Sequence, residues 1–171
     1  KKRPRYGEAI YIGSAYSNWA KYTNGEPDKC DSNQVLNNKL GPYLTAECID
    51  VKEGTTGGII SGNTFEAQGI SGENSADSWM DIKGNHYLIE NNTGNNTQPS
   101  VLKDGYQVNC AYEGWGSYNK FKNNLSNVNA DGYGINIKLK SSKGEAVGNE
   151  VYANNKVVNA GRGITNIELK K

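Results

Sequence analysis

The sequence predicts an all-β protein, a right-handed parallel β-helix (solenoid) of about five to six coils. Three observations carry this prediction: an asparagine that recurs at similar spacing, a second column of short alternating strands, and a composition that favours strands and turns over helices. Sequence periods of about 20 to 50 residues are typical of repeat folds, whose units stack to bury one continuous core.

The first column consists of an apolar residue followed three positions later by asparagine. The five asparagines are 25, 29, 32 and 30 residues apart: Asn38, Asn63, Asn92, Asn124 and Asn154. Stacked side-chain amides can hydrogen-bond from coil to coil, and asparagine tolerates the left-handed conformation of a tight turn. We therefore expect these residues to form a structural ladder at one corner of the solenoid.

The second column consists of short strands in which apolar and polar residues alternate. They are predicted at residues 9–12, 48–52, 79–83, 106–109, 134–138 and 164–168. Alternation places Ile49 and Val51 inward, and Asp50 and Lys52 outward. The segments between the repeats, above all the long segment 13–33, are expected to be loops.

Composition fits one elongated domain over residues 1–171. The mean hydropathy of −0.76 and the 21 glycines indicate a thin core with many turns. A net charge of +1 gives no general attraction to nucleic acid, and the basic residues 1–5 are interpreted as a solvated end. No apolar stretch is long enough for a membrane span and no signal peptide is present. We expect a mature secreted product or an excised fragment of a longer solenoid.

Three cysteines permit one disulfide and leave one thiol. A Cys30–Cys48 bridge would join neighbouring coils and is favoured, whereas Cys30–Cys110 would cross about three coils unless the first loop folds over the groove. Cys48 shares the outward parity of Asp50. Glycosylation sequons favour an extracellular location weakly, and they begin at Asn91, Asn95 and Asn124.

The segments 60–65 (Ile-Ser-Gly-Asn-Thr-Phe) and 35–38 (Val-Leu-Asn-Asn) resemble the repeats of the right-handed parallel β-helix superfamily, which includes pectate lyases and related polysaccharide lyases and hydrolases. The resemblance covers about residues 6–169. It implies the fold and points to a polysaccharide partner. The superfamily also contains epimerases, adhesins and proteins without known chemistry, so the resemblance does not select one activity.

The candidate catalytic residues are two stacked Asp-x-Lys strands, which contribute Asp50, Lys52, Asp81 and Lys83. Coil stacking would place the two carboxylates about 5 Å apart. An acidic edge and aromatic loops flank this outward face. The residues expected to bind substrate are Glu47, Asp77, Asp104, Gln107, Asn109, Tyr112 and Trp115, because aromatic rings can support flat sugar faces while polar groups bind hydroxyls.

Three uses of this face are open. Binding of a polysaccharide is the least demanding. In β-elimination on a uronate polymer, Asp50 and Asp81 would hold a Ca²⁺ that neutralises the sugar carboxylate, and Lys52 or Lys83 would remove the neighbouring proton. In hydrolysis, the aspartate pair would act as in retaining glycosidases, but the adjacent lysines favour two ionised carboxylates, which places hydrolysis below elimination.

Two structural interpretations compete with these functions. The Asp-x-Lys ladder can be a solvated sheet face with diagonally alternating charges that fixes coil register. The chain can also be a non-catalytic, self-associating solenoid, because no amphipathic capping helix is evident at either end and open ends expose strand edges. The single histidine, His86, is expected in a surface turn.

Overall fold

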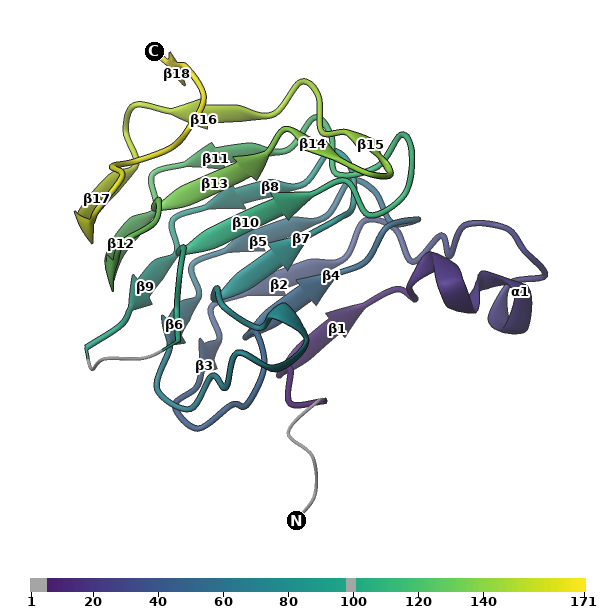
Figure 1. Ribbon diagram of the computed structural model, residues 1–171, viewed down its shortest axis with the longest axis horizontal. Coiled ribbons are helices and arrows are strands. Elements are labelled where there is room, and N and C mark those ends of the chain that lie inside the picture. The colour runs from purple at the N-terminus through teal and green to yellow at the C-terminus, as the bar shows by residue number, and fades with distance from the viewer. Residues whose placement is uncertain (1–5, 98–100) are drawn as a thin grey trace.

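The computed structural model describes residues 6–97 and 101–171 and shows an all-β parallel solenoid (Figure 1). The basic segment 1–5 lies outside the described residues. Sheet A, which carries the candidate site, contains β1 (Ile10–Ile12), β4 (Ile49–Val51), β7 (Met80–Ile82), β10 (Tyr106–Asn109) and β13 (Ile135–Lys138). Each strand pairs in parallel with its neighbour one coil away.

Two further parallel sheets complete each coil. Sheet B contains β2 (Gln34–Leu36), β5 (Ile59–Ser61), β8 (Leu88–Glu90), β11 (Lys120–Lys122), β16 (Glu150–Tyr152) and β18 (Leu169–Lys170). Sheet C contains β3 (Lys39–Leu40), β6 (Thr64–Glu66), β9 (Thr93–Asn95), β12 (Leu125–Ala130) and β17 (Lys156–Ala160). The remaining elements are η1 (Tyr16–Asn18), α1 (Trp19–Tyr22), η2 (Glu73–Ser75) and an antiparallel hairpin of β14 (Lys140–Ser141) and β15 (Gly144–Glu145).

The predicted fold class is confirmed, with slightly fewer coils than expected. The five strands of sheet A are separated by four coil-to-coil steps, which corresponds to about four turns. The segment predicted as a sixth strand, 164–168, contributes only a single bridge between Ile135 and Thr165. Within the described residues, no helix is long and apolar enough to cross a membrane.

The core is the inward face of the three sheets. Ile49, Val51 and Ile82 are fully buried, as the alternation predicts. Aromatic rings fill the centre of the core and contact one another edge to face. The ring centroid of Tyr106 lies 5.8 Å from that of Trp79 and 5.9 Å from that of Phe121. Such edge-to-face contacts add to the stabilisation that burial of the rings provides.

The cysteines do not follow the predicted pattern. Cys48 is fully buried, because it precedes β4 where the chain turns into the sheet, and its side chain joins the core instead of facing outward. Cys110 is also buried, whereas Cys30 is exposed, and all three are free thiols. The favoured Cys30–Cys48 disulfide is therefore absent.

The asparagine ladder is present at the corner between sheets B and C, with one correction. Each ladder carbonyl accepts hydrogen bonds from the backbone and side-chain nitrogens of the asparagine one coil before it, as Asn92 does from Asn63 at 2.9 and 3.0 Å. The fifth member is Asn155, which accepts from Asn124 at 3.0 and 2.9 Å. The turn after β16 is one residue longer than its counterparts, so the predicted Asn154 is displaced to the surface.

This correction predicts a large difference between two adjacent substitutions. Asn155→Ala removes a buried amide that also donates to Phe121 O at 2.8 Å, so we expect it to lower the free energy of unfolding by about 2 to 3 kcal/mol. Asn154→Ala removes one exposed contact with the Asn123 N–H and is expected to cost less than about 1 kcal/mol. Urea denaturation of both variants would show the reverse order if Asn154 were the ladder residue.

A second amide ladder lies between sheets A and B. Asn119 Oδ1 accepts from Tyr87 N at 2.9 Å, and Asn149 Oδ1 accepts from Asn119 N at 2.9 Å. His86 precedes this ladder in an exposed turn and stacks on Tyr118 at 5.0 Å between ring centroids, which confirms its predicted surface position. The two ladders fix coil register at two corners, and thereby fix which side chains meet on sheet A.

Candidate functional site

The outward face of sheet A forms one side of a cleft of about 670 Å³. Its floor carries the predicted catalytic set, Asp50, Lys52, Asp81 and Lys83, together with Gln107 and Asn109 from β10. One wall comes from the connection between β6 and β7, which contains η2 and projects beside β1 and β4 (Figure 1). The register is the predicted one, because Asp50 pairs with Asp81, Asp81 with Gln107, and Gln107 with Asn136.

The four charged residues form one continuous ion-pair chain. Asp50 contacts Lys52 at 2.5 Å and Lys83 of the next coil at 2.8 Å, and Lys83 also contacts Asp81 at 2.5 Å. Asn109 donates a further hydrogen bond to Asp81. The diagonal charge pattern expected of a register-fixing face is therefore present, and it lies at the floor of a cleft, where a ligand can reach it.

The chain of ion pairs holds Lys83 as a cation. Burial alone would lower the pKa of Lys83, but the charges of Asp81 and Asp50 outweigh burial and raise this pKa above its ordinary value. Burial alone would raise the pKa of Asp81, but Lys83 and the Asn109 amide outweigh it and lower that pKa. Lys83 is thus suited to electrostatic stabilisation, and an ionised Asp81 is unsuited to the protonated-carboxyl role that a retaining hydrolase requires.

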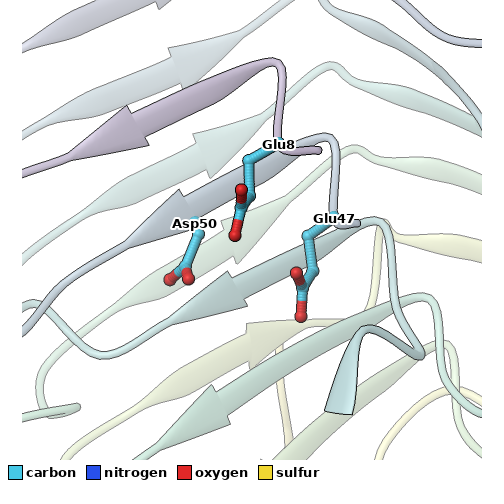
Figure 2. Close-up of side chains that lie close together, drawn as sticks. All are labelled: Glu8, Glu47 and Asp50. Carbon is cyan, nitrogen blue, oxygen red and sulfur yellow. The ribbon is translucent and has the colours of Figure 1, made fainter. Parts of the chain in front are cut away.

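Three carboxylates gather at one end of the cleft (Figure 2). Oxygen atoms of Glu8, Glu47 and Asp50 lie within 4.8 Å of one another. Hard carboxylate oxygens at such separations suit Ca²⁺. The set shares Asp50 with the predicted metal pair and does not include Asp81. Both oxygens of Asp50 also contact ammonium groups, of Lys52 and Lys83, so a cation here would compete with two lysines for Asp50.

Burial shifts the pKa of Glu47, one of the three members of this cluster. Burial, followed by the charges of Asp50 and Asp81, raises the pKa of Glu47 to about 7. A carboxyl whose pKa is raised on folding favours the folded state at low pH, and this contribution is lost as pH rises through the folded-state pKa. Above neutral pH, the ionised Glu47 therefore lowers the free energy of unfolding, unless a bound cation or a proton neutralises its charge.

This shift predicts a pH-dependent effect of Glu47→Gln. Between pH 4.5 and about pH 8, the protein with Glu47 is expected to lose about 3 kcal/mol of unfolding free energy relative to the variant. Parallel denaturation series at several pH values measure the difference. Glu26→Gln, an exposed glutamate on the first loop, is the control and should leave the pH profile unchanged. Equal profiles for all three proteins would contradict the assignment.

A second cavity of about 650 Å³ continues the cleft toward the later coils and shares Gln107 and Lys138 with it. Here the predicted substrate ligands bind one another. Gln107 Nε2 donates to Asp77 at 2.8 Å and to Asp104 at 3.0 Å, and Asn136 also donates to Asp104 at 2.9 Å. Asp77, Asp104 and Gln107 are buried to the same degree as Asp50, Asp81 and Glu47, and they line this second cavity.

The predicted aromatic rim takes a different form. Tyr112 packs against Tyr16 and Trp19 of the first loop, with ring centroids 5.2 and 5.4 Å apart. Neither Tyr112 nor Trp115 is among the described residues that line the two cavities, so this aromatic cluster fastens the first loop to the loop after β10. Glu53, which accepts the Tyr16 N–H at 2.7 Å, adds to the same anchor.

Tyr11 is a groove residue that the sequence-based selection missed. It pairs with Asp50 in the sheet, and the Lys52 ammonium lies 4.9 Å from the centre of its ring. Burial and the charge of Asp50 raise the pKa of Tyr11 to about 12, so the phenol keeps its proton at neutral pH. Tyr11 occupies the outward-facing position of β1, one coil before Asp50. The strand alternation that identified Asp50 therefore also identifies Tyr11.

No protein-family model matches the sequence, and a search of curated proteins also found no match. Among solved structures, the chain is similar to an alginate lyase from Paenibacillus sp. str. FPU-7. The TM-score is 0.83 and the sequence identity 33%, over 95% of this chain. The chain spans 51%, about half, of the length of that protein.

Proposed function

We propose that the sheet A cleft binds an acidic polysaccharide, with alginate as the first candidate, and cleaves it by β-elimination. The observation that carries the proposal is the cleft itself: two lysines, a protonated phenol and an acidic cluster meet on one face of a solenoid that is similar in fold and sequence to an alginate lyase. An extracellular location suits a polymeric substrate and stays a prediction.

The cleft divides the work of elimination among distinct groups. Lys52 is assigned as the base, because two carboxylates hold Lys83 as a cation. Lys52 first releases its ammonium proton to solvent, and the neutral amine then takes the proton from the carbon next to the uronate carboxyl group. The electrons of that C–H bond form the new C=C bond, the glycosidic C–O bond breaks, and the leaving oxygen takes a proton from Tyr11. Lys83 remains a cation throughout and stabilises the developing negative charge.

Ca²⁺ is the proposed partner of the acidic cluster. Glu8, Glu47 and Asp50 would hold it, and it would supply positive charge that neutralises a uronate carboxylate and acidifies the neighbouring carbon. Without a cation, an acidic polymer would meet the three carboxylates directly. Electrostatic repulsion at this end of the cleft makes a bound cation the simplest way to admit a uronate.

Ca²⁺ binding has a readout that is independent of catalysis. At pH 8, addition of Ca²⁺ at about 100 times its dissociation constant should stabilise the folded protein by about 3 kcal/mol. Glu47→Gln should lose most of this gain, and Glu26→Gln should keep it. Thermal unfolding with Ca²⁺ and with Mg²⁺ measures the effect. Equal shifts in the protein and in Glu47→Gln would remove the cluster from consideration.

Binding and cleavage are tested together on purified chain. Affinity electrophoresis through gels that contain alginate, pectate or a neutral glucan should show retardation by an acidic polymer alone. Ultraviolet absorbance of the unsaturated uronate should rise with time on the same polymer. Retardation without absorbance would retain the binding function and reject elimination, and the absence of both would reject the proposal.

End-to-end self-association is the structural alternative. At the first-coil end, β1, β2 and β3 are the outermost strands of their sheets, and a cavity of about 390 Å³ there is lined by Ile10 and by the buried Ile12 and Val35. Exposed edges of this kind can add further strands. Sedimentation velocity over a range of concentrations distinguishes the two functions, because a carbohydrate-processing monomer keeps one sedimentation coefficient whereas a stacking solenoid gives larger species as concentration rises.

A further inference from the structure

The later half of the groove differs from the first half in its cations. The charges of Lys52 and Lys83 are balanced by ion pairs with Asp50 and Asp81. Lys138, on β13, has no carboxylate within ion-pair distance among the described residues, and its Nζ donates only to the neutral Gln107 Oε1, at 2.8 Å. Its positive charge helps to lower the pKa of Asp81 at longer range, but no ion pair within the described residues occupies it, so a ligand carboxylate can contact it.

A buried network positions the Lys138 ammonium. Gln107 directs its Nε2 group to the carboxylates of Asp77 and Asp104, which leaves Oε1 as the acceptor that faces Lys138. All three of these network residues are buried, whereas Lys138 is half-buried and lines both cavities. Such fixed orientation is typical of a binding group, because little side-chain entropy remains to be lost when a ligand arrives.

A second cation lies farther along the same stretch. Arg162 is exposed, lines the second cavity, and has its guanidinium 5.9 Å from the ring centre of Tyr133. It forms no ion pair with a carboxylate of the described residues. A planar guanidinium binds carboxylates through two parallel hydrogen bonds. Asp131 is the exposed carboxylate of this stretch, and an acidic ligand would have to approach past it.

We infer that Lys138 and Arg162 form a carboxylate-binding subsite for uronates that are not cleaved, so that the polymer extends from the Lys52 end of the cleft across the later coils. The inference rests on the proposed function and adds to it the residues that select acidic over neutral chains. The Asp77–Asp104–Gln107 network positions this subsite and does not itself bind sugar.

The experiment compares four variants with the unmodified chain by calorimetric titration with alginate and with carboxyl-reduced alginate, in which the acid groups are alcohols. Lys138→Gln and Arg162→Gln should each weaken alginate binding about tenfold, the loss expected for one charge-assisted contact. Lys156→Gln removes the same charge from exposed β17 and should bind like the unmodified chain. Asp131→Asn should bind alginate more tightly.

The outcomes separate the subsite from the function. If the chain binds alginate and both groove variants bind as tightly as Lys156→Gln, the subsite is rejected while the proposed function stands. Equal affinity for alginate and its carboxyl-reduced form would also reject the subsite. If the unmodified chain binds neither polymer, the proposed function and the subsite fail together. Glutamine retains a donor toward Gln107, and thermal unfolding of each variant verifies that the fold is intact.

Discussion

Lys52→Met is expected to lower kcat on an acidic polysaccharide by a factor of about 100 or more, the usual contribution of a positioned acid or base. Methionine keeps most of the length and apolar volume of the side chain but has no proton acceptor. Lys156→Met, on exposed β17, is the matched control and should leave kcat unchanged. Initial rates of ultraviolet absorbance at saturating polymer measure the effect.

Tyr11→Phe tests the other half of the same step. It removes only the hydroxyl that would protonate the leaving oxygen, so kcat should again fall about 100-fold while affinity for the polymer stays near that of the unmodified chain. Tyr22→Phe, at an exposed residue of α1, is its control. Activity within a few-fold of the unmodified chain for both Lys52→Met and Tyr11→Phe would show that these residues are not the acid and base.

Lys83→Met is expected to be the most destabilising of these substitutions. It leaves Asp50 and Asp81 facing each other across the vacated position, and removal of one partner from a buried ion pair costs about 3 to 5 kcal/mol. The loss should be largest at neutral pH and smaller near pH 4, because protonation of the aspartates relieves their repulsion. Chemical denaturation at both pH values measures it.

Two comparisons make the Lys83 result specific. Lys120→Met breaks an exposed pair with Glu150 at 3.4 Å and should cost less than about 1 kcal/mol. Combining Lys83→Met with Asp81→Asn removes the carboxylate that is left without a cation, while Asp50 keeps its ion pair with Lys52, and should recover most of the lost stability. A Lys83→Met loss that is the same at both pH values and is not recovered would mean that packing, not charge, explains it.

The register of the site could be predicted from sequence because strand alternation has a period of two and each coil repeats it. Asp50, Asp81 and Gln107 are paired as predicted for this reason. Asn154 was assigned to the ladder in place of Asn155 because the two asparagines are adjacent. The local sequence does not show that this turn contains one extra residue.

Groups that depend on loops or on networks could not be predicted. The ring of Tyr112 packs against Tyr16 and Trp19 of a loop about 95 residues earlier, and sequence alone does not show where that loop packs. Glu8 joins Glu47 because the first coil stacks on the second. Among the residues that the structure describes, Lys138 forms no ion pair because Asp77 and Asp104 accept hydrogen bonds from Gln107 and do not contact the Lys138 ammonium.

The most direct test of a β-eliminating cleft is mass spectrometry of alginate oligosaccharides incubated with the chain in water enriched in heavy oxygen. Elimination predicts a new unsaturated non-reducing end on one product, which is lighter by one water than the corresponding hydrolysis product and carries no heavy oxygen at that end. The Lys52→Met variant should form neither of the two fragments that elimination produces. Fragments with a saturated new non-reducing end would show hydrolysis, and alginate that is neither bound nor cleaved would contradict a polysaccharide-processing role for this face of the solenoid.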